Sequence, residues 1–508
     1  MDHAPILVVI APFVGAYLIP LLGLWKEKLC YPVATVAALL SAFFSFWLTA
    51  SVLELGTIRY YVGGWEPPWG IELVVDPLSA FMCLTISLVS LFAVIYSKNY
   101  IGRELPGGKT TSYYTLILLL IGGMLGAVVT GDLFNLFVLT EIFSVAAYAL
   151  VCIGRKRGSL IASYRYLILA SIGTSLILLG TGYLYVVTGT LNMADLAARL
   201  PALYDSWVVI GAMAFLVVGF GIKTALFPLH TWLPDAHSIA PAPISVILSA
   251  LVIKVGAYSI IRVLFSIFGV EFITGPIPIA SVLTWVAAVG ILMGSLFAIS
   301  QTDIKRMLAY SSVAHIGYVI LGIGLAVEMG MTGGILHIFN HALAKGCLFF
   351  CAGAVIYQTG IRSIDDFRGL GSKMPVTMAA FTLAAASMVG IPPTAGFMSK
   401  LYLALGTLEA GAWVFLIVIL VGSFLTAVFY LRVINLIYFG ESRVKSQESR
   451  VGVGDSRLQT PDSRLFREVP LTMLIPIIIL ALGCTLFGIF VFIPLSVVEP
   501  AVKLLLGN

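Results

Sequence analysis

The fold of this chain is decided by the stretch GFGIKTALFPLHTWLPDAHS at residues 219–238. The stretch begins as an apolar helix, but it then contains a lysine, Lys223, and five residues later a proline, Pro228. Proline lacks the backbone amide that a helix interior needs, and a charge at the centre of a bilayer costs about 2.5–3.5 kcal/mol. Neither Lys223 nor Pro228 helps this apolar segment to span a membrane, so we expect the two residues to have another function.

The remainder of the chain is typical of a protein that crosses a bilayer many times. Of its 508 residues, 60% are hydrophobic and 10% are charged, which excludes a water-soluble globular fold. A bilayer core about 30 Å thick needs about 20 apolar residues per helix. Runs of that kind predict an all-α protein with fourteen transmembrane segments, and the alternating pattern of a β-barrel does not occur. The predicted segments are residues 5–24, 31–51, 77–97, 112–130, 132–154, 162–189, 206–229, 242–265, 279–300, 304–326, 331–358, 375–404, 410–438 and 470–497.

The lysines and arginines of the loops predict the orientation in a cell membrane (the inner or plasma membrane). Loops after odd-numbered segments contain 19 of these residues, whereas only Arg59, Arg199 and Arg262 are assigned to loops after even-numbered segments. The positive-inside rule therefore places the odd-numbered loops in the cytoplasm and both termini outside. Since no basic residue follows Met1 before the first segment, we do not expect a cleaved signal peptide.

Several titratable side chains lie inside the predicted segments, at depths where a bilayer disfavours charge. Desolvation favours the neutral form of a buried amine, whereas a nearby carboxylate favours its charged form, so such a lysine can exchange a proton near neutral pH. A row of these groups with histidines between them predicts a proton relay. The predicted relay residues are Glu141, Lys223, Lys254, His315, His337, His341, Lys345 and Lys400.

Three of these residues share one helical face. His337, His341 and Lys345 follow one another at intervals of four residues, and each such step turns only about 40° around a helix. Two histidines and a lysine on one face are hard to explain by packing alone.

Structural alternatives stay open for individual residues. Glu141 and a lysine could form an ion pair that only joins two helices. His315 fits hydrogen-bonded packing nearly as well as a relay. Asp132 is a candidate for proton uptake, but an acid at that position also marks a helix start, where the helix dipole favours it. The residues expected to be interfacial anchors are Asp303, Lys305 and Arg306.

Prolines and glycines interrupt the seventh and twelfth segments. Pro228 and Pro234 follow Lys223, and the stretch GIPPTAG at 390–396 precedes Lys400. Broken helices at matching positions of two halves indicate inverted repeats with an ion path between them. We therefore expect two five-helix repeats, segments 4–8 and 9–13, with discontinuous helices seven and twelve and with Lys400 as the counterpart of Lys223.

The polar residues after the first break allow two interpretations. His230, Asp235 and His237 are an acceptable zinc ligand set, but no fourth ligand or cysteine pair accompanies them. We expect them instead to satisfy the backbone of the broken helix or to take up protons from the cytoplasm. The six cysteines form no CxxC pair, so no iron–sulfur site is supported, and the chain shows no redox or hydrolytic motif. No metal or cofactor is expected.

The chain is predicted to be a single membrane domain, residues 1–508. Its longest polar interruption, 441–469, repeats ESR or DSR every seven residues. Glycines and a proline within it disfavour a coiled coil, so we expect a flexible cytoplasmic loop, with a basic patch for anionic lipid or a partner as the alternative. The predicted parts are 1–110 (helices 1–3), 111–265 (first repeat), 279–440 (second repeat), 441–469 (loop) and 470–508 (last helix).

Five stretches resemble one known family, the antiporter-like subunits shared by complex I, Mrp-type sodium/proton antiporters and membrane-bound hydrogenases, with the Mrp antiporter's D-type member most similar. They are GDLFNLFVLTEIF, GIKTALFPLHTWLPDAHSIAPAPISVILSALVIKVGAY, SQTDIKRMLAYSSVAHIGY, NHALAKGCLFFCAGAVIY and GIPPTAGFMSKLYLAL. The resemblance implies a pair of Glu141 and Lys223, a central Lys254, and a path through His315 and the eleventh segment to Lys400. Some complex I relatives have glutamate at the last position or histidine at the central one, and this chain has lysine at both.

The relay and the resemblance together predict a proton-translocating subunit of a multisubunit membrane complex. Mrp-type sodium/proton antiport is the preferred activity, and a proton pump within complex I or an energy-converting hydrogenase is the alternative. A stand-alone carrier of a small organic substrate would need a polar cavity that the sequence does not offer. The expected partners are other subunits, the lipid bilayer, protons and Na⁺, whose oxygen ligands could lie in another subunit; no nucleic acid is expected.

Overall fold

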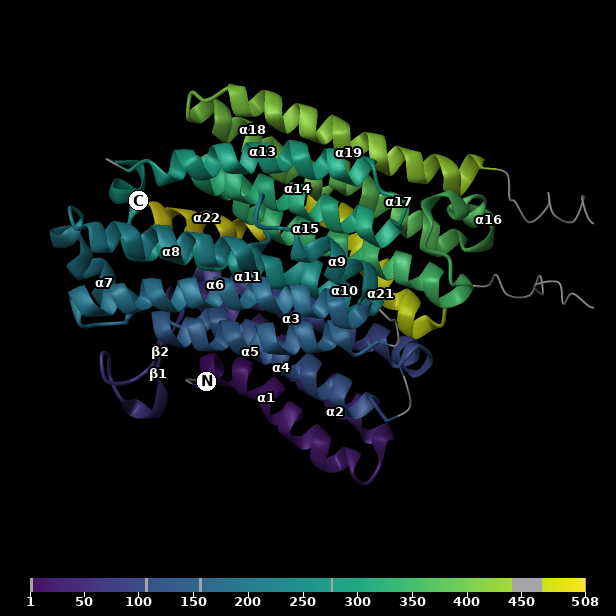
Figure 1. Cartoon of the computed structure of the whole chain (residues 1–508), viewed down its shortest axis with the longest axis horizontal. Helices are drawn as coiled ribbons and strands as arrows, with labels where there is room; N and C mark the ends of the chain where they lie inside the picture. Colours follow the sequence, from purple (N-terminus) through teal and green to yellow (C-terminus); the bar gives the residue numbers. More distant parts are fainter. Residues whose placement is uncertain (1–2, 106–107, 155–157, 276, 441–467, 508) are drawn as a thin grey trace, which may run out of the picture.

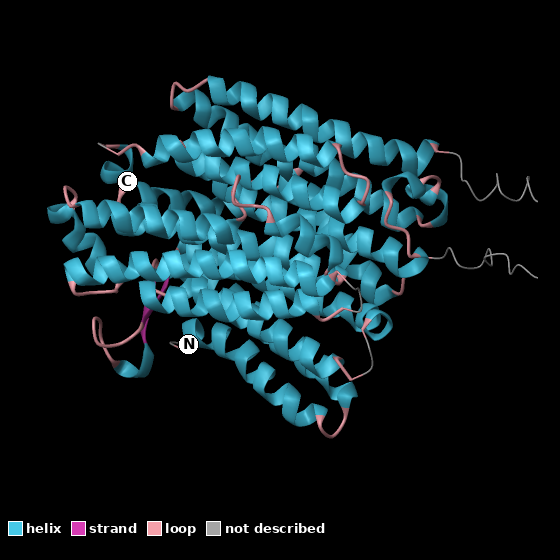
Figure 2. Ribbon diagram, viewed as in Figure 1, coloured by secondary structure: helices cyan, strands magenta, loops and turns pink. Residues whose placement is uncertain are grey.

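The computed structural model describes residues 3–105, 108–154, 158–275, 277–440 and 468–507. In this part of the chain, thirteen helical stretches are long and apolar enough to cross a membrane. The broken pair α17 (Pro375–Val389) and α18 (Ala395–Glu409) supplies a fourteenth crossing. The prediction of an all-α protein with about fourteen crossings is therefore confirmed, and nearly all of the ribbon in Figure 2 is helical.

The N-terminal part contains three long helices and a short hairpin. The hairpin strands are antiparallel, with Ile58 opposite Val75. Figure 1 shows α1 and α2 along one edge of the bundle and the hairpin at the same end as both chain termini. The elements are α1 (Ala4–Gly23), η1 (Glu27–Leu29), α2 (Cys30–Leu55), β1 (Ile58–Tyr61), η2 (Val62–Gly64), β2 (Glu72–Val75) and α3 (Pro77–Glu104).

The first repeat contains a broken seventh crossing and an eighth crossing with two π-helical stretches. Residue Ala225 adopts a left-handed conformation (φ 56°) and ends α8 five residues before the predicted boundary. The elements are α4 (Thr110–Val129), α5 (Leu133–Cys152), α6 (Ser159–Thr188), α7 (Met193–Arg199), η3 (Leu200–Leu203), α8 (Trp207–Thr224), α9 (Trp232–Ile239), α10 (Ala242–Ile247), the π-helix η4 (Leu248–Val252), α11 (Ile253–Ile261), the π-helix η5 (Arg262–Phe268) and α12 (Val270–Thr274).

The second repeat ends at the opposite edge of the bundle, where Figure 1 shows α18 and α19. The last crossing is predicted at residues 470–497. In the structure, the helical region there extends to Leu506 and consists of two helices that meet near Phe490. The elements are α13 (Ile279–Ile299), α14 (Ile304–Gly324), α15 (Glu328–Thr359), η6 (Ile364–Phe367), α16 (Leu370–Lys373), α17, α18, α19 (Val414–Phe439), α21 (Leu471–Ile489) and α22 (Phe492–Leu506). Of the loop 441–469, residues 441–467 lie outside the described residues, as do residues 155–157 of the basic loop after the fifth segment.

The two repeats have matching backbone hydrogen bonds. At the start of α5, Asp132 forms a β-bridge with Asn192, and at the start of α14, Asp303 forms the same bridge with Ser363. Each of the two aspartates also caps its own helix. Since α5 and α14 begin on opposite sides of the membrane, the same local structure occurs twice in inverted orientation, as the breaks predict.

The core lies in the eighth and eleventh crossings. Most residues of the stretches Ala242–Phe268 and Glu328–Thr359 are buried within the bundle, whereas the outer helices expose large apolar side chains such as Leu21, Phe46 and Phe424. Those side chains fit a lipid environment, where charged groups are disfavoured. The titratable residues of the core are thereby removed from lipid.

The last crossing packs directly on the second helix break. A Cβ atom added to Gly488 of α21 would lie 2.0 Å from the carbonyl oxygen of Pro393. We expect Gly488→Ala to lower the thermal stability of the purified protein by about 1–3 kcal/mol, because the break must move to admit the methyl group. Gly182→Ala in α6, where nothing lies within 4 Å, is the matched control. Equal melting temperatures for the two variants would contradict this packing.

Candidate functional site

The carboxylate of Glu141 and the ammonium of Lys223 form an ion pair between α5 and α8. Lys223 Nζ lies 3.2 Å from Glu141 Oε1 and donates a second hydrogen bond to Ser144 Oγ at 2.9 Å. The hydroxyl of Thr174 on α6 donates to the same carboxylate oxygen. The side chain of Lys223 is 2% exposed and that of Glu141 is 34% exposed, so only the carboxylate reaches the edge of the bundle.

The helix break places Lys223 at the end of α8. The backbone carbonyls of a last helical turn lack intrahelical partners. Trp232 of α9 provides a partner for one of these carbonyls, because its indole N–H donates to the carbonyl oxygen of Ile222 at 2.9 Å. A residue after the break, Trp232, thus satisfies one backbone carbonyl beside the lysine.

Lys254 lies in the eighth crossing, directly after the π-helical stretch η4. Its ammonium donates to the carbonyl oxygen of Ser249 one turn earlier. The hydroxyl of Ser249 lies 2.7 Å from that of Ser312 on α14, which joins the two repeats at this depth. Single π-helical turns inside α-helices frequently occur at functional sites.

Three histidines form a stack between α14 and α15. The ring centroid of His315 lies 5.3 Å from that of His337 and 5.1 Å from that of His341. His315 Nδ1 lies 3.0 Å from His337 Nε2, and His337 Nδ1 lies 2.8 Å from Ser399 Oγ of α18. Among the described residues, neither ring nitrogen of His341 has a protein hydrogen-bond partner, although the ring is buried. His315 and His337 are thus joined by a hydrogen bond, whereas His341 contacts both of them by ring stacking alone.

Lys345 continues the same face of α15 toward α14. Its ammonium donates to the carbonyl oxygen of Leu308 at 2.8 Å and lies 3.4 Å from the hydroxyl of Tyr430. Since His341 also contacts α14, the residues predicted to share one helical face do so.

Lys400 ends the row, and it is held by carbonyl groups instead of a carboxylate. Its ammonium donates to the carbonyl oxygens of Met388 at 2.9 Å and Val389 at 3.0 Å, and to Ser423 Oγ at 3.0 Å. It also lies 4.8 Å from the ring centroid of Tyr318. The carbonyl end of α17 carries partial negative charge, which favours an ammonium there.

The expected correspondence between Lys223 and Lys400 is wrong in detail. The two breaks have equivalent hydrogen bonds, and the alignment that they give places Lys400 opposite Asp235, and Lys223 opposite Met388. The lysines therefore lie on opposite sides of their breaks, although the ammonium of Lys400 reaches back to the Met388 carbonyl. The equivalent amide-to-carbonyl bonds are Leu226 to Gly221 and Ile391 to Ala386, Ala225 to Ile222 and Gly390 to Ser387, and Leu229 to Leu226 and Thr394 to Ile391.

The starts of α5 and α14 allow the same comparison. The same number of residues separates Glu141 from the capping Asp132 and Ser312 from the capping Asp303. The second repeat therefore has serine where the first has its carboxylate. Burial raises the pKa of the Asp132 carboxyl, whose side chain accepts the Asn135 amide at 2.7 Å, so its observed contact is that of a helix cap.

The polar residues after the first break point to different partners. The ring of His230 stacks on Phe227, and the buried ring of His237 stacks on Phe349, 5.0 Å between centroids. Asp235 instead faces outward. Because the three side chains do not converge, they are not one metal-ligand set, and no group of three His, Cys, Asp or Glu among the described residues could hold a metal ion.

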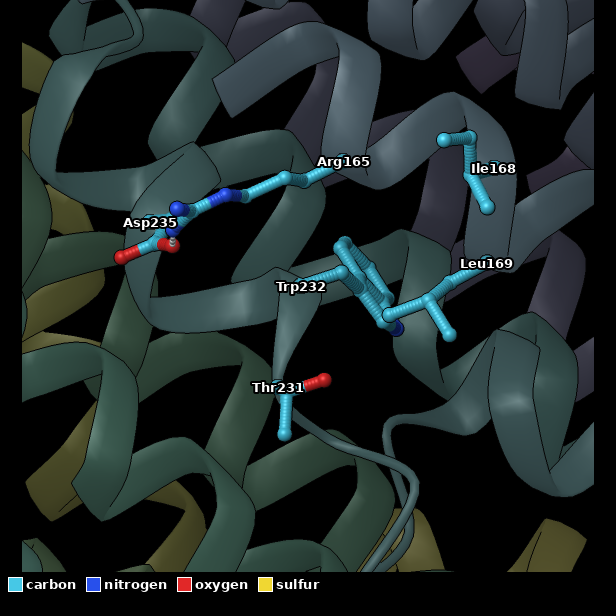
Figure 3. A pocket seen from close by; sticks show the side chains of 6 residues that line it. All are labelled: Arg165, Ile168, Leu169, Thr231, Trp232 and Asp235. Carbon is cyan, nitrogen blue, oxygen red and sulfur yellow. Dashed lines mark hydrogen bonds and ion pairs between the residues drawn. The ribbon is translucent and has the colours of Figure 1, made fainter. Parts of the chain in front are cut away.

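Asp235 lies in an open cavity between α6 and α9 (Figure 3). It accepts a hydrogen bond from Arg165 Nη1 at 2.7 Å and lies 3.3 Å from Arg306 Nη2. The cavity has a volume of about 340 Å³ and is lined by Arg165, Ile168, Leu169, Thr231, Trp232 and Asp235. Figure 3 shows the Trp232 ring on its wall, the same ring whose N–H contacts the turn before Lys223.

Two basic residues differ from the sequence interpretation. Arg262, assigned to a loop, is buried in the eighth crossing, where its Nη2 lies 2.5 Å from Asp76 Oδ1. Lys305, expected as an interfacial anchor, is also buried and donates to the carbonyl oxygen of Ala240 at 2.5 Å. The spacing of Arg262 from Lys254, two steps of four residues, was the signal that could have placed it on the helix.

Comparison with known sequences gives one family. Residues 130–426 match the family described as NADH:quinone oxidoreductase/Mrp antiporter, TM, and residues 62–107 match the N-terminus of NADH-ubiquinone oxidoreductase (complex I) chain 5. The chain is 47% identical to NADH-quinone oxidoreductase subunit N of Desulforudis audaxviator (strain MP104C), over 96% of each sequence. It is 30% identical to the D-type subunit of the Na(+)/H(+) antiporter of Bacillus subtilis (strain 168), over 87% of this chain and 88% of that one.

Solved structures have the same fold over the whole chain. A subunit of the membrane-bound sulfane sulfur reductase, an archaeal respiratory membrane complex, superposes with a TM-score of 0.89 at 30% identity, covering 100% of this chain and 98% of that one. A subunit of the Mrp complex from Dietzia sp. DQ12-45-1b gives 0.88 at 26% identity, covering 99% and 97%. Both are parts of multisubunit membrane complexes.

Thr174 is a contact of the ion pair that the sequence did not reveal. We expect Thr174→Val to reduce proton transport into vesicles about tenfold, because a hydrogen bond to a charged group is worth about 1.5–3 kcal/mol. Thr181→Val is the matched control, since both threonines lie buried on α6 and bond their own helix backbone, but only Thr174 also bonds Glu141. Equal transport by the two assembled variants would show that this hydroxyl does not support the pair.

Proposed function

The chain belongs to the NADH:quinone oxidoreductase/Mrp antiporter family of membrane subunits, and we propose that it translocates protons within a multisubunit membrane complex. The proposed activity is Mrp-type cation (Na⁺)/proton antiport. The observation that carries the proposal is the buried pair of Glu141 and Lys223 beside a helix break, followed by titratable groups that lead to a second break at Lys400.

The proposed relay runs through the middle of the bundle. A proton moves from the pair of Glu141 and Lys223 to Lys254, then to the histidine stack with Lys345, and finally to Lys400. The stack supports this order, because His315 and His337 are within hydrogen-bond distance and His337 touches the residue before Lys400.

The pair of Glu141 and Lys223 is proposed to control the first transfer. An ammonium that a carboxylate holds at 3.2 Å keeps its proton, and lengthening that distance favours its release. Within the described residues, Lys254 contacts a backbone carbonyl and no carboxylate, so in the proposed transfer its neutral amine accepts the proton that the Lys223 ammonium releases, which leaves Lys223 neutral and Lys254 charged. Transport is thereby linked to a change of conformation at α8.

We propose that the complex lies in the cell (inner or plasma) membrane with both termini outside and the odd-numbered loops in the cytoplasm. The loop charges support this orientation, and both termini lie at one end of the bundle in Figure 1. The cavity at Asp235 then opens at the cytoplasmic side and is the proposed place of proton uptake, with His237 deeper inside. His230 packs between aromatic rings and is assigned a structural role.

Removing either member of the ion pair tests the proposal. We expect Glu141→Ala and Lys223→Ala to reduce ΔpH-dependent antiport in vesicles to background, because each leaves the other charge without its partner. Lys503→Ala, on an exposed lysine of α22, should keep wild-type antiport. Assembly is checked by co-purification of the other subunits. Normal antiport by assembled complexes with either relay substitution would reject the proposed relay.

A second candidate function is the same relay in a redox-driven enzyme. The relative named NADH-quinone oxidoreductase subunit N favours it, at 47% identity. The redox centres would then belong to partner subunits, since the sequence of this chain has no motif for one. The native complex distinguishes the two functions: iron in stoichiometric amount and quinone-dependent proton uptake would favour the redox enzyme, and an iron-free complex with Na⁺-dependent proton release would favour the antiporter.

A further inference from the structure

A second cluster of buried charge lies on the eighth crossing, away from the histidine stack. The guanidinium of Arg262 contacts both carboxylate oxygens of Asp76, with Nη1 at 2.6 Å from Oδ2 and Nη2 at 2.5 Å from Oδ1. Nη2 also donates to Ser79 Oγ at 2.8 Å, and Nε donates to the hydroxyl of Tyr258 at 2.7 Å. All four residues are buried, so the cluster joins α3 to the eighth crossing without contact with bulk solvent.

The cluster lies in line with the central lysine of the relay. Lys254, Tyr258 and Arg262 are separated by steps of four residues and therefore share one face of the eighth crossing. From Lys254, this face runs toward the end of the bundle that holds the hairpin and both termini in Figure 1. Toward that end, the next polar side chains on this face after Lys254 are Tyr258 and then Arg262.

Arg262, the last group on this face, is unable to pass a proton on. Arginine has five N–H donors, no acceptor, and does not lose its charge in proteins. The hydroxyl of Tyr258 donates its one proton to the carbonyl oxygen of Val128 at 2.6 Å while it accepts from Arg262. A proton wire needs groups that both accept and release protons, and this face ends at a group that does neither.

The remaining acid of the cluster is kept ionised. Burial on its own would raise the pKa of the Asp76 carboxyl, but the charge of Arg262 and the hydrogen bonds from Arg262 and Ser79 lower that pKa below its usual range. Asp76 therefore stays paired with the guanidinium and is not available as a proton carrier.

We propose that Arg262, held by Asp76, closes the outward route along the eighth crossing, so that a proton on Lys254 leaves only sideways through the histidine stack. The inference rests on the proposed relay and adds a residue that determines its direction. Arg262 contacts no relay group itself. Its proposed effect is that a proton on Lys254 has no path outward along the eighth crossing. Coupling between the two repeats depends on this closure, because an open route beside Lys254 would let protons bypass the second repeat.

The test replaces the arginine with a side chain that can carry protons. We expect Arg262→His to raise passive proton flux through vesicles that contain the complex about tenfold, because imidazole accepts and releases protons near neutral pH. The flux is driven by a potassium diffusion potential with valinomycin, without a sodium gradient. Arg262→Gln combined with Asp76→Asn is the matched control: it removes both the ion pair and the carboxyl that Arg262 keeps ionised, and neither amide titrates, so its passive flux should equal that of the wild type.

The comparison separates closure from a purely structural role. A structural role predicts that the histidine and glutamine variants lose stability alike and that neither leaks, and that result would overturn the inference. Should Arg262→His fail to assemble, the double variant Asp76→Asn with Arg262→His removes the unpaired carboxylate and should leak as well; a tight double variant would also overturn the inference.

The proposed relay is tested separately from this closure. Passive flux is measured without antiport, so a leak in Arg262→His stands even if antiport by the wild-type complex is absent. Conversely, normal antiport in the wild type with no leak in the histidine variant would reject only the closure.

Discussion

An ammonium group buried among membrane helices needs a partner, and the contact of Lys223 with Glu141 is the one on which the rest of the structure depends. It requires α5 and α8 to lie side by side, and Thr174 adds α6 to the same contact. It also requires α8 to end near Lys223: Ala225, two residues later, turns the chain, and the indole N–H of Trp232 bonds the carbonyl oxygen of Ile222. Isolated buried charges are costly, whereas paired and hydrogen-bonded ones are tolerated.

The second repeat also holds a buried ammonium, but without a carboxylate partner in the described part of the chain. Its terminal ammonium, on Lys400, is held by two backbone carbonyls at the end of a helix and by a serine hydroxyl. The two terminal lysines of the row are therefore held by different groups, Lys223 by a carboxylate and Lys400 by backbone carbonyls.

Much of the fold could be predicted from the sequence, because apolar length and the prolines of the two breaks are local signals. The charged residues of the row were also visible, since a lysine in an apolar run is conspicuous. What the sequence could not provide was register: the alignment of Lys400 with Asp235 depends on hydrogen bonds across each break. The burial of Arg262 was missed because it lies near the predicted end of its segment, and its partner Asp76 is far away in the chain.

The inverted repeats match in their backbone but differ in chemistry at corresponding positions. Glu141 of the first repeat corresponds to Ser312 of the second, and Asp235 corresponds to Lys400. Two chemically identical inverted halves would be related by a two-fold axis, and such a molecule would have no way to distinguish one face of the membrane from the other. The substitution of charges between the halves removes that equivalence, and it gives a symmetric scaffold a preferred direction.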